Sequence, residues 1–361
     1  MSENPAAPLR FSCGKSMKNR FMLAPMTNTQ SHEDGRLSED EYQWLTMRAK
    51  GGFGLVMTCA SHVQFSGKGF PGQLGIYSDE QIAGHKRLAR EIKSYGSLAV
   101  IQLHHAGMRS PKELINQEPL CPSDNEKHGA RAMTLKEVEA LRKDFINAAI
   151  RAKKSGYDGV EVHGAHGYIL TQFLSKEINH RQDHYGGNLD NRSRLLFDII
   201  DGIRKECGSE FLIGVRLSPE RFGMELSEVK EICKRLVREK KIDFLDISLW
   251  DVFKFPEQEE HQRKTLLQHF RELELADVKL TVAGKIKSGK DVQEVLASGV
   301  DFVTVGRSAI LHHDFPKRVL DTPEFVPKKT PVSTKYLTEE GLGPNFIQYM
   351  RRWPGFVVNE Q

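Results

Sequence analysis

Three side chains that can hold or move protons lie within six residues of one another. The segment His163-Gly-Ala-His166-Gly-Tyr168 follows the apolar run Gly159–Val162, a pattern typical of a strand that ends in a loop. Two imidazoles and a phenol at one strand exit can polarise a carbonyl group and supply a proton. Two histidines three residues apart could equally be metal ligands or structural hydrogen bonders, so the elements that position them must decide.

Short β-rich runs that could form strands recur along the whole chain. Their number, about eight, is what a closed (β/α)8 barrel, an α/β TIM barrel, requires. Helix start signals, in which Ser or Thr is followed three residues later by an acid, stand between the runs at Ser38, Thr134 and Ser288, and Ser227 opens another helix. The predicted strands are Phe21–Met26, Gly54–Ala60, Leu98–His104, Asp158–His163, Phe211–Leu217, Ile242–Leu249, Lys279–Gly284 and Asp301–Gly306.

The connections between these elements differ in length. Helix-to-strand links are short, whereas several strand-to-helix links are long: Ser61–Ser78, His105–Met133, Gly164–Gly187 and Trp250–Glu260. In a barrel the long links gather at the carboxyl ends of the strands, where enzymes of this fold build their active sites. We expect one domain over residues 1–361, with the barrel at about 20–320 and a proline-rich C-terminal tail at about 321–361.

Composition narrows the class of protein. The net charge of +4 comes from interleaved acids and bases, which argues against nucleic-acid binding and mildly favours an anionic ligand. The five cysteines include no CxxC pair, so the usual zinc or iron–sulfur spacing is missing. The chain shows no signal peptide and no apolar stretch of membrane length, so we expect a cytoplasmic protein without a membrane partner.

The residues at the predicted strand ends suggest a ligand. Gly284 and Gly306 close the last two strands, where backbone N–H groups can approach a phosphate, and Arg307 can add donors; each could also be structural. Gln102 and Arg216 fit a planar polar partner such as the edge of a flavin ring. Pairing of Arg216 with a carboxylate such as Glu161 is the structural alternative.

Combined motifs give the chain a strong resemblance to one family. Leu23-Ala-Pro-Met26, Ile101-Gln-Leu-His-His-Ala-Gly107, Val160-Glu-Val-His-Gly-Ala-His-Gly-Tyr168, Asn179–Asn188, Asn191-Arg192 and Val305-Gly-Arg307 resemble the Old Yellow Enzyme family of FMN-dependent NAD(P)H oxidoreductases, from about Leu9 to Leu320.

The resemblance implies an ene-reductase that reduces the C=C bond of small α,β-unsaturated carbonyl compounds by a ping-pong cycle, with NADPH or NADH as reductant. His163 and His166 would bind the substrate carbonyl and Tyr168 would donate the proton. A homo-oligomer is allowed, and in some relatives a C-terminal arginine, here near Arg351–Trp353, enters a neighbouring subunit. By position, FMN would contact Ala24, Pro25, Met26, Thr27, Ala60, Gln102, Arg216, Gly284, Gly306 and Arg307.

The chain also departs from the family pattern. Met108 interrupts the usual His-Ala-Gly-Arg run and displaces the arginine to Arg109, and Thr29 stands where some relatives carry a tyrosine. Both departures concern the substrate pocket. The iron–sulfur cluster of larger relatives is not expected here. The alternative function is that of a metal-dependent barrel hydrolase or lyase with His163 and His166 as ligands, although no third ligand stands at a convincing strand end.

Overall fold

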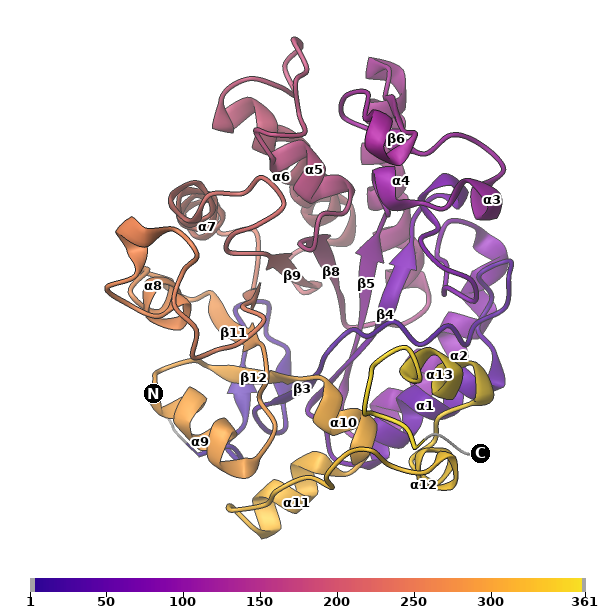
Figure 1. Cartoon of the computed structure of the whole chain (residues 1–361), viewed down its shortest axis with the longest axis vertical. Coiled ribbons are helices and arrows are strands. Elements are labelled where there is room, and N and C mark those ends of the chain that lie inside the picture. Colours follow the sequence, from indigo (N-terminus) through magenta and orange to yellow (C-terminus); the bar gives the residue numbers. More distant parts are fainter. Residues whose placement is uncertain (1–3, 359–361) are drawn as a thin grey trace.

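The chain forms a closed barrel of eight parallel strands, as the sequence predicts (Figure 1). The structure is a computed structural model that describes residues 4–358. The strands follow one another around the barrel in chain order, and the last pairs with the first, so the sheet has no open edge. They are β3 (Phe21–Leu23), β4 (Leu55–His62), β5 (Leu98–His104), β8 (Gly159–Gly164), β9 (Leu212–Leu217), β10 (Phe244–Ser248), β11 (Lys279–Ala283) and β12 (Phe302–Val305).

A helix follows each barrel strand, and the helices surround the strands (Figure 1). Smaller elements lie in the long strand-to-helix loops: α3 (Lys112–Ile115) with the paired strands β6 (Leu120–Cys121) and β7 (Arg131–Ala132) after β5, and α5 (Ile169–Leu174) after β8. The helices around the barrel are α1 (Glu39–Lys50), α2 (Ile82–Ser94), α4 (Leu135–Lys154), α6 (Leu189–Cys207), α7 (Leu226–Glu239), α8 (Leu266–Arg271), α9 (Gly289–Ala297) and α10 (Arg307–Leu311).

The start signals of the helices are confirmed in part. Thr134 and Ser288 each cap a helix and form the reciprocal capping box. Ser38 caps α1 by accepting a hydrogen bond from the backbone N–H of Glu41, but the Glu41 carboxylate does not return the bond. It is buried and accepts hydrogen bonds from Asn28 and Ser31 instead. The expected start at Ser227 is one residue late, because α7 begins at Leu226.

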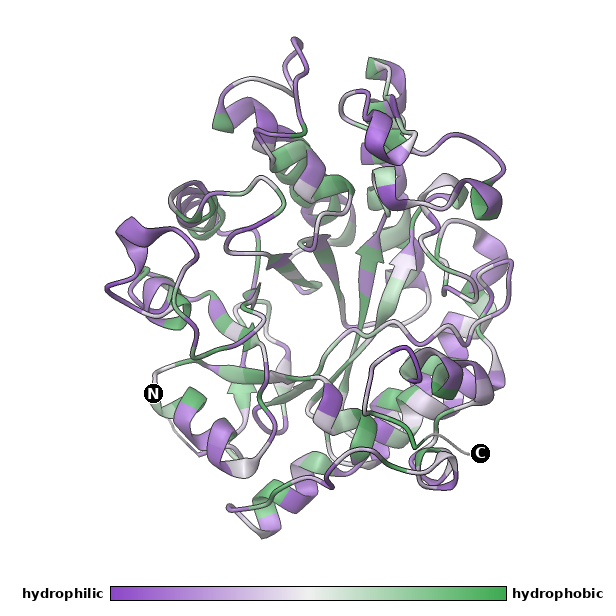
Figure 2. Ribbon diagram, viewed as in Figure 1, coloured by the Kyte–Doolittle hydropathy of each residue, from purple (hydrophilic) through white to green (hydrophobic). Residues whose placement is uncertain are grey.

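The barrel interior is apolar near the amino ends of the strands. Side chains alternate along each strand, so one set faces the barrel axis and the other packs under the helices. Figure 2 shows hydrophobic colouring along the strands and on the helices beside them. A two-stranded hairpin, β1 (Leu9–Arg10) and β2 (Ser16–Met17), closes this end of the barrel. Its Phe11 ring lies 5.9 Å from the Phe244 ring and 5.8 Å from the Phe302 ring.

Nearer the carboxyl ends of the strands the barrel interior is polar. The inward side chains there are Gln102, Glu161, Arg216 and Asp246. The register explains their proximity. Gln102 pairs with Glu161 across β5 and β8, and Arg216 pairs with Asp246 across β9 and β10. An irregularity in β4 between Met57 and Ala60 shifts the register, so that Ala60 lies opposite Gln102. The polar layer faces the end where the long loops meet.

The segment after the barrel packs against the same chain. Its helices are α11 (Phe315–Asp321), α12 (Thr334–Glu339) and α13 (Pro344–Met350), and α13 lies beside α1 (Figure 1). The Phe346 ring is buried edge-on against Trp44, with ring centroids 4.8 Å apart. The guanidinium carbon of Arg48 lies 3.3 Å from the centre of the Trp44 ring. Trp353 lies 4.8 Å from the guanidinium carbon of Arg307. The tail therefore reaches the barrel rim of its own chain.

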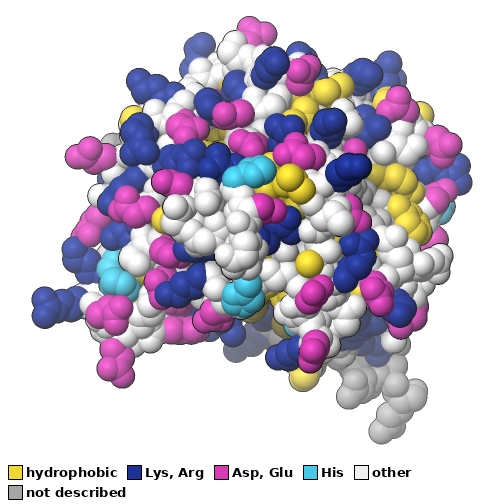
Figure 3. Space-filling model, turned by 90° about the horizontal axis from the view of Figure 1, so that it is seen from above, with side chains coloured by type: hydrophobic (Ala, Val, Ile, Leu, Met, Phe, Trp, Pro, Cys, Tyr) yellow, Lys and Arg dark blue, Asp and Glu magenta, His cyan; other side chains and the backbone are white. Residues whose placement is uncertain are grey.

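The outer surface is charged in a mixed way. Figure 3 shows Lys and Arg side chains interleaved with Asp and Glu on the face it presents. Among residues 4–358, no helix has both the length and the apolar character that crossing a membrane requires.

Candidate active site

The structure brings His163, His166 and Tyr168 together at the end of β8. The His163 and His166 ring centroids are 5.1 Å apart, and the Tyr168 ring lies 5.4 Å from that of His163. His163 is the inward residue next to Arg216 in the sheet register. His166 and Tyr168 follow in the loop, so the strand and the first turn after it present all three side chains to one place.

A strained turn fixes the orientation of His166. Its φ is 63°, in the left-handed region that few non-glycine residues adopt, and Gly167 follows with a φ of 74°. Two serines from neighbouring strand ends hold the residue: the Ser218 hydroxyl accepts the His166 N–H at 2.9 Å, and the Ser248 hydroxyl lies 2.7 Å from Nε2. Strain of this kind is typical of functional sites. If Ser248 donates to Nε2, the imidazole proton lies on Nδ1.

Burial sets the protonation of this cluster. It lowers the pKa of both His163 and His166 well below the ordinary value, and the nearby positive charges of Arg216 and Arg109 lower these pKa values further. Both rings are therefore neutral at pH 7. Burial also raises the pKa of Tyr168, so its phenol keeps the proton. Each histidine can donate one N–H, and the tyrosine can act as an acid.

A buried group of charged and polar side chains lies inside the barrel, next to the cluster of His163, His166 and Tyr168. The Gln102 amide donates to Glu161 at 2.7 Å, and Arg216 Nε lies 3.2 Å from Asp246 Oδ2. Arg216 therefore forms its ion pair with Asp246, and the expected alternative partner Glu161 binds Gln102. Burial and the adjacent Asp246 raise the pKa of Glu161 to about 8, so the two carboxyl groups hold one proton near neutral pH. The Arg216 cation faces one carboxylate.

The other residues predicted to bind a cofactor lie around the same rim. Ala24–Thr27 form a loop, and not the end of β3 as predicted, because the strand stops at Leu23 and Pro25 has no N–H to donate. Gly284 and Gly306 also lie just beyond their strands, which end one residue before each. Arg307 is exposed and opens α10.

The surroundings of Gly284 and Gly306 differ. At Gly284, φ is 152° and a Cβ would lie 2.8 Å from the backbone of Trp250 and Asp251, so the close approach of two loops requires glycine. At Gly306, a Cβ would come no nearer than 3.7 Å to any other residue, and the atoms it would face belong to Met26 and Ala24. A Cβ at Gly306 would therefore meet the Ala24–Thr27 loop only at ordinary van der Waals distance.

Comparison with known proteins identifies the family of the chain. Residues 7–322 match the model of the NADH:flavin oxidoreductase / NADH oxidase family. The chain belongs to this family. It is 37% identical over 328 residues to the probable NADH-dependent flavin oxidoreductase YqiG of Bacillus subtilis, with 88% of each chain covered. It is 32% identical to the NADPH dehydrogenase of Bacillus pumilus, covering 84% of this chain and 90% of that one.

Solved structures agree with this assignment. The Old Yellow Enzyme homologue from Zymomonas mobilis superimposes with a TM-score of 0.79 at 27% identity, over 94% of this chain and 98% of that one. Other relatives are longer, and the chain spans only 32% to 48% of their length. As a member of the NADH:flavin oxidoreductase family, the protein uses FMN as its cofactor and NADH or NADPH as reductant.

The rim fits such a cofactor. Gly306 exposes its own backbone without a Cβ, and Arg307 stands next to it, which suits a phosphate group. The polar layer of Gln102 and Arg216 supplies donors for the oxygen and nitrogen atoms of a flavin ring. By contrast, no group of three His, Cys, Asp or Glu side chains within residues 4–358 is arranged to hold a metal ion, so the metal-dependent alternative has no support.

A glutamine clamp joins the two loops that carry the site. The buried Gln172 amide donates to the carbonyl groups of Ala106 and Gly167 and accepts from the backbone N–H of Met108. Gly107 fits below it with a φ of 63°, because a Cβ there would lie 2.3 Å from the amide oxygen. The loops after β5 and β8 are therefore fixed to each other.

Sequence reasoning missed several residues of the site. The His104 ring lies 5.6 Å from that of His163 and 4.4 Å from that of Tyr168, although its position at a strand end was visible. Asp246 and Ser248 belong to the sixth strand, whose end carries no familiar motif. The signal was an acidic residue at an inward position of a buried run, Phe244–Ser248.

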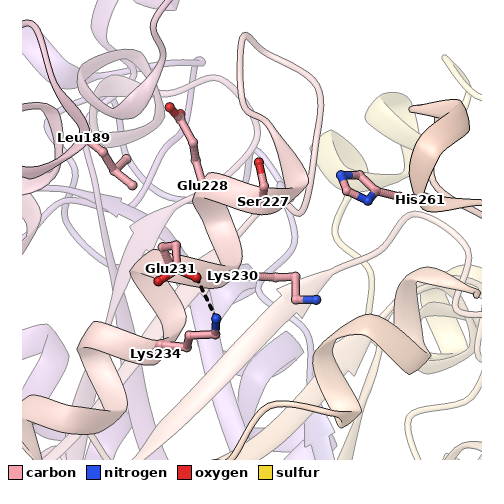
Figure 4. Close-up of a pocket in the computed structure, with 7 residues that line it drawn as sticks. All are labelled: Leu189, Ser227, Glu228, Lys230, Glu231, Lys234 and His261. Atoms are coloured by element: carbon pink, nitrogen blue, oxygen red, sulfur yellow. Dashed lines mark hydrogen bonds and ion pairs between the residues drawn. The ribbon is translucent and has the colours of Figure 1, made fainter.

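One hollow on the molecule lies away from this site. Figure 4 shows it on the outer side of α7, where the ammonium of Lys234 pairs with Glu231 at 2.6 Å. Its charged side chains come mostly from α7. Because it is on the outer helix ring and the strained, buried groups are at the strand ends, we place the functional site at the strand ends.

Proposed function

We propose that the protein is an ene-reductase that reduces the C=C bond of α,β-unsaturated carbonyl compounds. The observation that carries the proposal is the cluster of two buried neutral imidazoles and one protonated phenol at the end of β8. Reduction of an activated alkene requires stabilisation of a developing enolate oxygen and delivery of one proton to carbon. These three side chains match that requirement.

The cofactor site follows from the rim. We assign FMN to the residues Ala24, Pro25, Met26, Thr27, Ala60, Gln102, Arg216, Gly284, Gly306 and Arg307, with the phosphate at Gly306 and Arg307. Bound there, FMN would supply the hydride chemistry that links NAD(P)H to the substrate. Arg216, whose charge is paired with Asp246, offers its remaining N–H donors to the ligand at the carboxyl ends of the strands.

The protein side chains then act on the substrate. His163 and His166 each donate a hydrogen bond to the carbonyl oxygen and stabilise the charge that develops there. Ser218 and Ser248 hold His166 in place for this task. Tyr168 donates its proton to the α-carbon, and burial beside the histidines keeps that proton on the phenol until it is needed.

The experiment is an anaerobic titration of the purified protein. We expect a flavin absorption spectrum that bleaches on addition of NADH or NADPH and returns on addition of one equivalent of 2-cyclohexenone, with cyclohexanone as product. If oxygen or a quinone restores the spectrum and none of a panel of enones does, the protein is a flavin oxidoreductase of another specificity and the proposal is wrong.

A further inference from the structure

The loop after β5 places an arginine where the family pattern has none. The chain turns at Gly107–Arg109, and the Met108 side chain is buried in a small apolar cluster with Cys121 and Ala130. The Cys121 thiol lies 3.8 Å from the Met108 sulfur. Because Met108 points into this cluster and Gln172 holds its backbone, the next side chain, Arg109, is exposed on the opposite side of the turn.

Arg109 turns toward the reacting groups. Its Nη1 donates to the backbone carbonyl of His166 at 2.6 Å, and its guanidinium carbon lies 4.7 Å from the centre of the Tyr168 ring. Its charge lowers the pKa of His104, His163 and His166, which shows that it acts on the same space. The bond to His166 is its one hydrogen bond to residues 4–358, so most donors of the guanidinium are free of partners in that part of the chain.

Among residues 4–358 the charge of Arg109 also has no counter-ion. Two other arginines near the strand ends are paired, Arg216 with Asp246 at 3.2 Å and Arg221 with Glu257 at 3.6 Å. Within residues 4–358 no carboxylate lies within ion-pair distance of Arg109.

The groups whose pKa values the Arg109 charge lowers do not supply a negative charge either. They are the imidazoles of His104, His128, His163 and His166 and the phenol of Tyr168. None of these groups is anionic at neutral pH. An unpaired guanidinium beside a reaction site is suited to bind an anion, and its planar fork matches a carboxylate.

We propose that Arg109 binds a carboxylate carried by the substrate, so that the enzyme prefers unsaturated carbonyl compounds that bear a carboxylate over neutral ones. The inference rests on the proposed function, in which the carbonyl oxygen lies on His163 and His166. The carboxylate then lies on the side of the substrate that faces Tyr168. Arg109 adds no chemical step: it selects and orients the substrate.

A pair of phenols of nearly equal shape tests the charge. 3-Hydroxybenzoate and 3-hydroxybenzamide can both place the phenol oxygen on the histidines, and only the first carries a carboxylate. Their dissociation constants are measured from the change in the flavin spectrum of the holoenzyme at fixed ionic strength. For the parent protein we expect the benzoate to bind on the order of tenfold tighter, the usual effect of a hydrogen bond to a charged group.

Three variants locate the effect. Arg109→Gln should bring the two dissociation constants to within about threefold of each other, and Arg109→Lys should keep part of the preference, because a point charge remains without the fork. Arg221→Gln is the matched control, since it removes another rim guanidinium that already has a carboxylate partner, and it should leave the ratio unchanged. Flavin content and the unfolding midpoint show that each variant is folded.

The outcomes are distinct. An equal affinity of the parent for both phenols, or a preference that survives Arg109→Gln, overturns the assignment of Arg109. Turnover of 2-cyclohexenone by the parent is measured in parallel. If the parent does not reduce the enone and the phenol ratio still depends on Arg109, the ene-reductase function is wrong and the anion site stands.

Discussion

Replacing Tyr168 with phenylalanine removes one hydroxyl and separates the roles of the site. Within residues 4–358 the Tyr168 hydroxyl has no hydrogen-bond partner, and the ring contacts with His163, His104 and Arg109 need only the aromatic face and edge. Phenylalanine preserves these contacts, so the free energy of unfolding should change by less than about 1 kcal/mol. A loss of activity would then report on chemistry.

The effect should fall on one half of the cycle. Reduction of the flavin by NAD(P)H needs no proton from the phenol and should keep its rate within a few-fold. Reoxidation by 2-cyclohexenone needs a proton at carbon, and removal of a positioned acid costs roughly two to four powers of ten in rate. That range corresponds to about 2.7–5.5 kcal/mol of activation free energy.

Anaerobic stopped-flow spectroscopy measures the two half-reactions separately. Reoxidation by a quinone is the control, because its product takes its proton at oxygen from water and should be much less affected. An enone step that stays within a few-fold of the parent rate would remove Tyr168 from the mechanism and leave it as a packing residue.

Three further predictions follow from the geometry. His163→Ala and His166→Ala should each weaken phenol binding and slow enone turnover while FMN stays bound; unchanged spectra on phenol titration of both variants would contradict the role of the pair. Glu161 has a pKa raised from 4.5 to about 8 by burial, so its contribution to stability is complete below pH 4.5 and is lost as the pH rises to about 8. Urea unfolding of the flavin-free protein should show this loss, of the order of a few kcal/mol in the parent and smaller in Glu161→Gln, and parallel pH profiles would refute it. Phe346→Ala should cost roughly 3–5 kcal/mol because the ring is fully buried against Trp44, and an unchanged urea midpoint would show that the tail contributes nothing to the fold.

The fold was predictable because its signals are local. Apolar runs separated by capped helices gave the eight strands, and the observed strands differ mostly at their ends. The Ala24–Met26 extension was wrong because an apolar run does not show that Pro25 leaves the ladder. The hairpin that closes the barrel was not predicted, since its two strands have only two residues each and no periodicity can be read from them.

The part of the site that lies in one sequence motif was predictable. The contacts between residues of different strands were not. His163, His166 and Tyr168 lie in one segment, so their proximity follows from the sequence. The partner of Arg216 does not, because Asp246 lies beside it only through the register of β9 against β10. The direction of Arg109 depends on the burial of Met108 against Cys121 and Ala130, which lie further along the same long loop and meet it only through the fold of that loop.

The Gln172 clamp limits how this enzyme can be redesigned. Engineers often alter substrate range by exchanging one active-site loop for that of a relative. Here exchange of the loop after β5 alone would leave the buried amide of Gln172 facing a foreign backbone, and each lost hydrogen bond at a buried polar group costs about 1–3 kcal/mol. The loops after β5 and β8 form one graftable unit, and a chimera should transfer them together with the glutamine that joins them.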